Sequence, residues 1–296
     1  MSPTLIAALG PLASVIDDTV RDLCVTNDGR VWRGTSRGLA PTDLILEPRE
    51  ARRIGVGLID ATGGRVDDAR PLGDSALAGS FRIHVALPPI ARGGPALTLR
   101  LPQQNPVGLD AFRIDGAVRS ADLANESLLI TGATGSGKTT LLGAVMGTFP
   151  AHERIVVLED IPEIDSRHPH VVHLATRDAN AEGAGAIDLR ALVRQSLRMS
   201  PDRIVIGEVR GAELVDVLLA LTSGHRGLAT LHARGLEDVP DRLTALGLVA
   251  GIDPPTVARL ITAAFDLVAH CERTPDGFRV RVGRFERDGN DVRVVT

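Results

Sequence analysis

The sequence predicts an α/β protein in which a small α+β domain precedes a larger domain with a mainly parallel sheet. From about residue 104 onward, short apolar runs alternate with segments of helical periodicity, which is the pattern of parallel strands joined by helices. A glycine-rich motif at 132–139 lies between one such strand and the next helix. Before residue 104 the apolar residues alternate with polar ones in short runs separated by turn residues, which is typical of half-buried strands.

The first domain is expected to span residues 1–103 and the second residues 104–296. In the first domain an Asn-Asp-Gly turn separates two short strands near residues 25 and 30. Alternation of apolar and polar residues predicts further strands at 80–87 and 96–100. The segment 102–108 is polar and rich in chain-breaking residues, which favours it as the domain boundary.

In the second domain the predicted strands and helices alternate. Apolar runs predict buried strands at 127–130, 154–158, 204–206 and 227–231, and helical spacing predicts helices at 139–146, 189–197 and 213–221. Gly224 is placed to end the third helix, and Asp253 followed by Pro254 predicts the start of a fourth. Two Asp-Gly pairs predict turns between strands at the C-terminal end of the chain.

Composition places the chain among ordinary globular proteins. Hydrophobic residues make up 44% and charged residues 24% of the 296 residues. The formal net charge of -4 provides no basic excess, so we expect no direct nucleic-acid binding. No apolar stretch reaches roughly 18 residues, so we expect neither a transmembrane segment nor a signal peptide. The low cysteine content is typical of a cytoplasmic location, where thiols stay reduced. Cys24 and Cys271 are too few for a disulfide framework or a four-cysteine zinc module, and we expect reduced thiols.

The glycine-rich segment carries the clearest chemical signal. It matches the full phosphate-binding pattern G-x-x-x-x-G-K-[ST]. The matching residues are Gly132, Ala133, Thr134, Gly135, Ser136, Gly137, Lys138 and Thr139, and Thr140 follows them. Glycines let the backbone N–H groups surround the phosphates, and the helix that begins there adds its positive end. Lys138 is expected to reach the β- and γ-phosphates, and the Thr139 hydroxyl is expected to bind Mg²⁺. The motif therefore predicts a site for ATP and Mg²⁺.

Two further strands end in acidic residues. Glu208 ends an apolar strand, where a carboxylate can orient and polarise the attacking water, although Gly207 stands where such strands usually carry an aspartate. Glu159, followed by Asp160, ends another strand, so it can bind Mg²⁺ or position water and replace the missing aspartate. Glu163 is a weaker candidate of the same kind. The alternative for each is an ordinary solvated acid.

Two histidines flank the strand predicted at 227–231. His232 follows its end, where an imidazole can hydrogen-bond a γ-phosphate or report its loss, and His225 precedes it. Taken alone, a histidine is as often a packed or surface residue.

Together, the four motifs at 132–140, 157–164, 197–213 and 223–233 resemble those of the type II/type IV secretion and pilus-assembly ATPases. The segments 21–32 and 81–100 also resemble the N-terminal domain of the TadA/CpaF-like branch. The resemblance implies a RecA-like P-loop ATPase domain in a homohexameric ring, with nucleotide held between the two domains. It also implies Mg²⁺-dependent ATP hydrolysis that drives Tad/Flp pilus or type IV-like secretion machinery, with inner-membrane platform proteins as partners.

Site residues follow from the same resemblance. Arg82 and Arg100 become candidates to reach the phosphates from the N-terminal domain. Arg210, two residues after Glu208, becomes a candidate to neutralise charge on the transferring phosphoryl group. A surface ion pair is an equally reasonable role for each arginine.

Three alternatives stay open at this point. The motor could be a VirB11-type traffic ATPase of conjugative transfer, because that branch shares the four motifs. A small-molecule P-loop kinase would use an arginine-rich lid rather than a Gly-Glu strand end with flanking histidines. A scaffold that binds nucleotide without hydrolysing it would have no need of Glu208.

Overall fold

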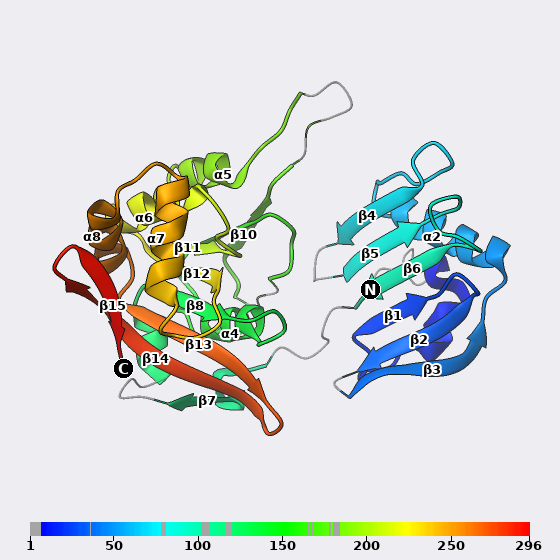
Figure 1. Ribbon diagram of the computed structural model, residues 1–296, viewed down its shortest axis with the longest axis horizontal. Helices are drawn as coiled ribbons and strands as arrows, with labels where there is room; N and C mark the ends of the chain where they lie inside the picture. The colour runs from blue at the N-terminus through cyan, green and yellow to red at the C-terminus, as the bar shows by residue number, and fades with distance from the viewer. Residues whose placement is uncertain are drawn as a thin grey trace. The chain divides into compact units, whose positions relative to one another are not determined.

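The structure is a computed structural model that describes residues 7–35, 37–77, 81–101, 107–115, 120–164, 166, 168–177, 179 and 184–296, apart from the side chains of 76, 77, 120 and 121. The chain divides into two compact units, Met1–Asn105 and Pro106–Thr296 (Figure 1). Residue 80 and most of the segment 102–108, the predicted domain boundary, lie outside the described residues. Within the described part of the chain, no helix is both long enough and apolar enough to cross a membrane.

The first unit is an antiparallel sheet with a helix on one face. Its six strands lie in the order β3-β2-β1-β6-β5-β4. The strands are β1 (Asp22–Val25), β2 (Arg30–Thr35), β3 (Gly38–Ile45), β4 (Leu72–Leu77), β5 (Phe81–Ala86) and β6 (Ala96–Arg100). Helix α2 (Pro48–Asp60) and a 3-10 helix η1 (Gly10–Val15) accompany them. Ile54 and Leu58 of α2 share one apolar core with Leu23, Ile83 and Leu99 of the sheet. This unit has the predicted α+β character.

The predicted turn between β1 and β2 depends on glycine. Gly29 adopts a φ of 81°, and a Cβ there would overlap the carbonyl oxygen of Leu46. Only glycine meets both conditions.

The second unit is a nine-stranded sheet in the order β10-β9-β11-β12-β8-β13-β14-β15, with β7 paired to β14. The strands are β7 (Phe112–Asp115), β8 (Leu128–Gly132), β9 (Ile155–Glu159), β10 (Val171–Ala175), β11 (Arg203–Ile206), β12 (Arg226–His232), β13 (Leu267–Thr274), β14 (Gly277–Asp288) and β15 (Asp291–Val295). The strands from β10 to β13 are parallel to one another, and β14 and β15 extend the sheet in antiparallel fashion. The mainly parallel sheet predicted from the apolar runs is confirmed.

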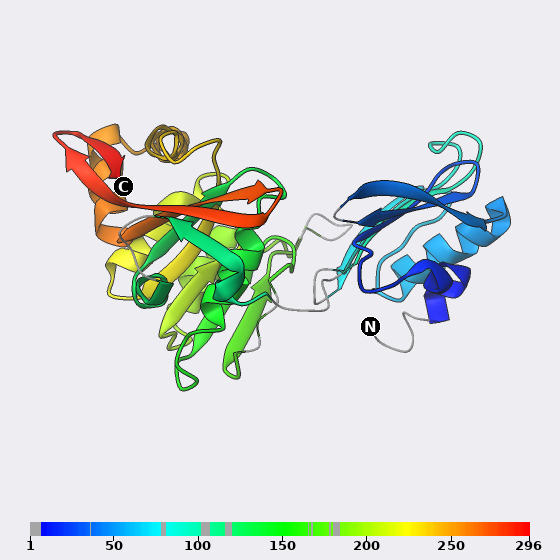
Figure 2. The ribbon, with the colours of Figure 1, turned by 90° about the horizontal axis from the view of Figure 1, so that it is seen from below.

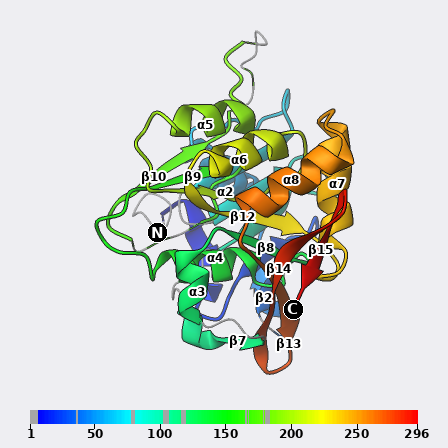
Figure 3. The ribbon, with the colours of Figure 1, turned by 90° about the vertical axis from the view of Figure 1, so that its left-hand side faces the viewer.

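Helices cover both faces of this sheet (Figure 3). They are α3 (Ser120–Asn125), α4 (Lys138–Met146), α5 (Leu189–Ser196), α6 (Glu213–Thr222), α7 (Val239–Val249) and α8 (Pro254–Ala264), with the short 3-10 helix η2 (Leu109–Ala111) before β7. One apolar core joins α3 and α4 to the sheet, and another joins α5, α6, α7 and α8 to its opposite face. Figure 2 shows the long antiparallel ribbon of β13 and β14 running beside these layers. Because β8, β9, β11 and β12 are parallel and adjacent, their carboxyl ends meet at one edge, where ligands bind in such sheets.

Candidate active site

The glycine-rich loop follows β8 and leads into α4, as predicted. Gly132, Gly135 and Gly137 adopt positive φ values of 149°, 76° and 102°. Gly132 also has no room for a side chain, because a Cβ there would lie 2.6 Å from the carbonyl oxygen of Cys271. The Ser136 hydroxyl is buried and has no hydrogen-bond partner among the described residues. A close-wrapped loop of this kind, at a helix N-terminus, suits the phosphates of a nucleotide.

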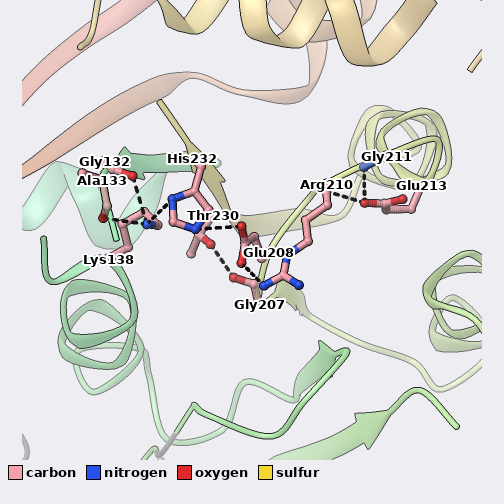
Figure 4. Close-up of polar contacts among 10 residues, drawn as sticks. All are labelled: Gly132, Ala133, Lys138, Gly207, Glu208, Arg210, Gly211, Glu213, Thr230 and His232. Atoms are coloured by element: carbon pink, nitrogen blue, oxygen red, sulfur yellow. Dashed lines mark hydrogen bonds and ion pairs between the residues drawn. The ribbon is translucent and has the colours of Figure 1, made fainter. Parts of the chain in front are cut away.

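Lys138 is buried at the start of α4, with 8% of its surface exposed. Its ammonium donates to the carbonyl oxygens of Gly132 and Ala133, at 3.0 Å each, and to Nδ1 of His232 at 3.2 Å (Figure 4). Burial lowers the pKa of Lys138, and the nearby Glu208 carboxylate acts in the opposite direction. The ammonium thus lies within the loop, where it is expected to bind the phosphates of a nucleotide.

His232 links the P-loop lysine to the acid after β11. Its Nε2 lies 3.0 Å from Oε1 of Glu208, and its Nδ1 faces Lys138. An ammonium can only donate, so Nδ1 accepts from Lys138, and the imidazole proton is on Nε2 and is donated to Glu208. The contacts therefore assign the Nε2–H tautomer. The register that pairs His232 with Gly132 on the neighbouring strand brings these groups together.

Glu208 is held from its other side by Arg210. Nη2 of Arg210 lies 2.6 Å from Oε2 of Glu208, and the hydrogen bond to that carboxylate raises the pKa of the guanidinium. The Glu208 side chain is 18% exposed and that of Arg210 is 61% exposed. Lys138, His232, Glu208 and Arg210 thus form one continuous chain of polar contacts at the carboxyl edge of the sheet (Figure 4).

Two residues that were not predicted as site residues hold the backbone around Glu208 in place. Thr230 on β12 donates its hydroxyl to the carbonyl oxygen of Gly207. Oε1 of Glu213, the first residue of α6, accepts the backbone N–H groups of Arg210 at 2.5 Å and Gly211 at 2.7 Å. The sequence carries a local signal for Glu213 alone: an acidic residue in the first turn of a helix often accepts the backbone N–H groups that precede the helix.

Glu159 lies at the same edge, at the end of β9, but one of its oxygens is committed. Oε1 accepts the backbone N–H groups of Glu163 and Ile164, each at 2.8 Å, and Oε2 lies 4.0 Å from Nδ1 of His173. This arrangement leaves Oε2 as the oxygen that can face a metal or water. Glu163 contributes its backbone to this arrangement.

His225 lies away from the P-loop, and Arg82 and Arg100 belong to the first unit. His225 precedes β12 at the end of the strand opposite to His232, and its Nδ1 lies 3.1 Å from the Ser223 hydroxyl. The structure therefore does not bring His225 to the P-loop. Arg82 and Arg100 are paired in register on β5 and β6 of the first unit, and Nε of Arg100 lies 3.2 Å from Oδ1 of Asp22. Their contact with phosphates stays a prediction.

The remaining P-loop residues are arranged along the turn into α4. Ala133 and Thr134 are exposed, whereas Thr139 and Thr140 are half-buried in the first turn of the helix. Among the described residues, no group of three or more His, Cys, Asp or Glu side chains could hold a metal ion alone. Mg²⁺ in nucleotide sites is bound mainly through phosphates and waters with one or two protein oxygens, so Thr139 and Glu159 remain suitable donors.

Solved structures share this architecture. The pilus retraction motor PilT with bound ADP superposes with a TM-score of 0.67 at 18% identity, covering 95% of this chain and 83% of that one. The ATPase DotB of Legionella pneumophila superposes with a TM-score of 0.59 at 19% identity, covering 89% and 76%. At these identities the likeness concerns the fold, and the predicted RecA-like fold class is confirmed.

Sequence relatives are more specific. A Mycobacterium tuberculosis protein named "Putative conjugal transfer protein" is 42% identical, over 92% of this chain and 81% of its own length. The conjugal transfer protein TrbB of Rhizobium radiobacter is 31% identical, over 91% and 85%. The type IV secretion system protein PtlH of Bordetella pertussis is also 31% identical, over 93% and 91%. The model of the family described as "Type II/IV secretion system protein" matches residues 75–279. The chain therefore belongs to the type II/IV secretion system protein family.

Proposed function

We propose that the chain hydrolyses ATP in a Mg²⁺-dependent reaction and works as a ring-shaped, homohexameric motor at the cytoplasmic face of a membrane. The observation that carries this proposal is the chain of contacts from Lys138 through His232 to Glu208. It joins a phosphate-binding loop to a carboxylate at the edge where such sheets bind ligands. A protein that only binds nucleotide has no need of that carboxylate.

Each of the candidate site residues has a distinct role in this proposal. Lys138 binds the β- and γ-phosphates, and Thr139 contributes its hydroxyl to Mg²⁺. Glu208 orients and polarises the attacking water, and Glu159 supports the metal or the water through Oε2. His232 is assigned to respond to the γ-phosphate because it is one of three acceptors of the Lys138 ammonium, with the carbonyl oxygens of Gly132 and Ala133. An ammonium has three N–H groups, so a bound phosphate must replace at least one of these acceptors. Arg210 neutralises charge that develops on the transferring phosphoryl group.

The machinery that the motor serves is either a Tad/Flp-type pilus or a type IV-like secretion system, with inner-membrane platform proteins as partners. The resemblance of residues 21–32 and 81–100 to the TadA/CpaF-like branch supports the pilus. The names of the relatives support the second candidate, a VirB11-type traffic ATPase of conjugative transfer. A pilin-like gene beside the coding gene would favour the first, and a relaxase-like gene would favour the second.

Steady-state phosphate release from ATP and Mg²⁺, measured across protein concentration, tests the enzymatic part. We expect activity that rises more than linearly with protein because the ring must assemble. Glu208→Gln is expected to abolish release while ATP binding persists. The matched control is Glu286→Gln, because Glu286 is an exposed acid paired with Arg293 on the last two strands. Equal release from wild type and Glu208→Gln would remove Glu208 from the mechanism. If the wild type binds ATP but releases no phosphate, the chain would instead be a scaffold that binds nucleotide without hydrolysing it.

A further inference from the structure

The P-loop lies against an aromatic ring on β14. A Cβ at Gly137 would lie 2.6 Å from Cε1 and 2.7 Å from Cδ1 of Phe278, so the ring fills the space beside the glycine. Gly137 has a φ of 102° and directly precedes α4. The ring therefore limits how the last glycine of the loop can move toward β14.

The same ring is stacked on a second aromatic side chain. The centroids of Phe278 and Phe112 are 5.0 Å apart with an interplanar angle of 26°, and the two residues are paired in register. The guanidinium of Arg273 lies 5.3 Å from the centroid of the Phe278 ring. Phe112 is the first residue of β7, and β7 is the first strand of the second unit along the chain. An unbroken series of contacts thus leads from Gly137 through two rings to the strand that follows the segment joining the units.

Strand β13 fixes this series relative to the start of the P-loop. The Thr131 hydroxyl and Nδ1 of the buried His270 are 2.9 Å apart, and the carbonyl of Cys271 closes off the side of Gly132. β13 is paired with β8 on one side and β14 on the other. Both ends of the P-loop therefore rest on the β13–β14 ribbon, and Phe278 supplies the contact at the far end.

We propose that Phe278 is a positioning residue for the nucleotide, and that the Phe112–Phe278 pair couples occupation of the P-loop to β7. The proposal rests on the function proposed above. Phosphate binding needs the backbone N–H groups of the loop held in one arrangement, and a loop held in advance loses less conformational entropy on binding. Removing the ring frees Gly137 and weakens binding. Conversely, a bound nucleotide that fixes Gly137 also fixes the two rings and β7.

ADP affinity of the intact chain tests the positioning role. Phe278→Leu is expected to weaken ADP binding by about threefold to tenfold, the range given by the loss of one aromatic pair. We also expect KM for ATP to rise while kcat stays within about twofold, because the Glu208 end of the site is untouched. The control is Phe149→Leu, which removes a buried ring under Arg203 beyond the far end of α4. It is expected to cost stability without changing ADP affinity.

Hydrogen exchange with and without ADP tests the coupling. ADP is expected to slow exchange of the β7 amides in the wild type and in Phe149→Leu, and to have a smaller effect in Phe112→Leu. If the wild type binds no ADP, the proposed function fails. If the wild type binds ADP but β7 exchanges at the same rate with and without it, the coupling is wrong. Equal ADP affinities of Phe278→Leu and wild type would overturn the positioning role.

Discussion

Glu159 occupies the space that any side chain at Gly207 would need. Its Cγ lies 2.9 Å from the position of a Cβ at Gly207, and the two residues end or follow neighbouring parallel strands. Position 207, where such strands usually carry an aspartate, is therefore a glycine, and the side chain of Glu159 from the adjacent strand fills that volume. Gly207 and Glu159 are two parts of one packing arrangement.

This relationship predicts how Gly207 responds to substitution. Gly207→Ala is expected to lower the free energy of unfolding by about 1–3 kcal/mol, because the new methyl group would overlap the buried Glu159 side chain on β9, which cannot move freely. In the Glu159→Ala background the same substitution is expected to cost much less. Urea unfolding of the two single variants and the double variant measures the coupling. Gly57→Ala is the control, since a Cβ on that helical glycine meets nothing within 4 Å. Additive effects would contradict the shared volume.

His232 is expected to matter for turnover more than for binding. His232→Ala removes the group that joins Lys138 to Glu208, while the ion pair of Glu208 with Arg210 remains. We expect kcat to fall by about 10²-fold, as for the loss of one oriented polar group at a reacting centre, with ADP affinity within about threefold of wild type. His225→Ala is the control, because His225 lies at the opposite end of the same strand. Equal losses in the two variants would rule out a specific role for His232.

The sequence predicted features that have a local cause. Apolar runs predicted the buried strands β8, β9, β11 and β12, and Asp-Gly pairs predicted the turns at Gly277 and Gly289, both of which adopt positive φ. Helix α2 was not predicted, although Pro48 at its start and buried residues such as Ile54 and Leu58 at helical spacing carry the signal. The three arginines among its first six residues obscured the apolar face.

Other parts of the site have no local cause and could not be predicted. Phe112 and Phe278 are far apart in the chain, and only the pairing of β7 with β14 brings their rings together. The committed Oε1 of Glu159 likewise depends on the path of the loop through Glu163 and Ile164. Residue type and spacing predicted that Lys138, Glu208 and His232 lie at the carboxyl edge of the sheet, but they wrongly added His225. The partners of each group depend on tertiary packing.

Glu126 gives the stability a pH dependence. Burial and the neighbouring carboxylate of Asp266 raise the pKa of Glu126 above its ordinary 4.5. A raised carboxyl pKa contributes stability that is present below the ordinary value and is lost as the pH rises through the folded value. Glu126→Gln removes this loss, so we expect it to be more stable than wild type near neutral pH. The gain should be under about 1 kcal/mol because the pair is largely solvated.

Thermal or urea unfolding at several pH values measures this effect. The difference between Glu126→Gln and wild type should disappear below about pH 4, where the wild-type carboxyl is protonated in both states. A difference that is independent of pH would show that packing rather than charge is responsible. Asp266→Ala is expected to be destabilising at every pH, because Oδ2 of Asp266 also accepts the backbone N–H of Ser127 at 2.8 Å.

Cys271 should be a sensor of local opening beneath the P-loop. Burial raises the pKa of its thiol to about 12, and the residue is 2% exposed. Only the thiolate reacts with disulfide reagents, so the folded chain should expose no reactive Cys271 near neutral pH. In a Cys24→Ser background we expect negligible labelling of the native protein and one labelled thiol per chain in urea. ADP should slow the residual labelling further, because a ligand of the folded state lowers the population of open forms. Rapid labelling of native Cys24→Ser protein would show that β13 does not hold the P-loop as the contacts of Gly132 indicate.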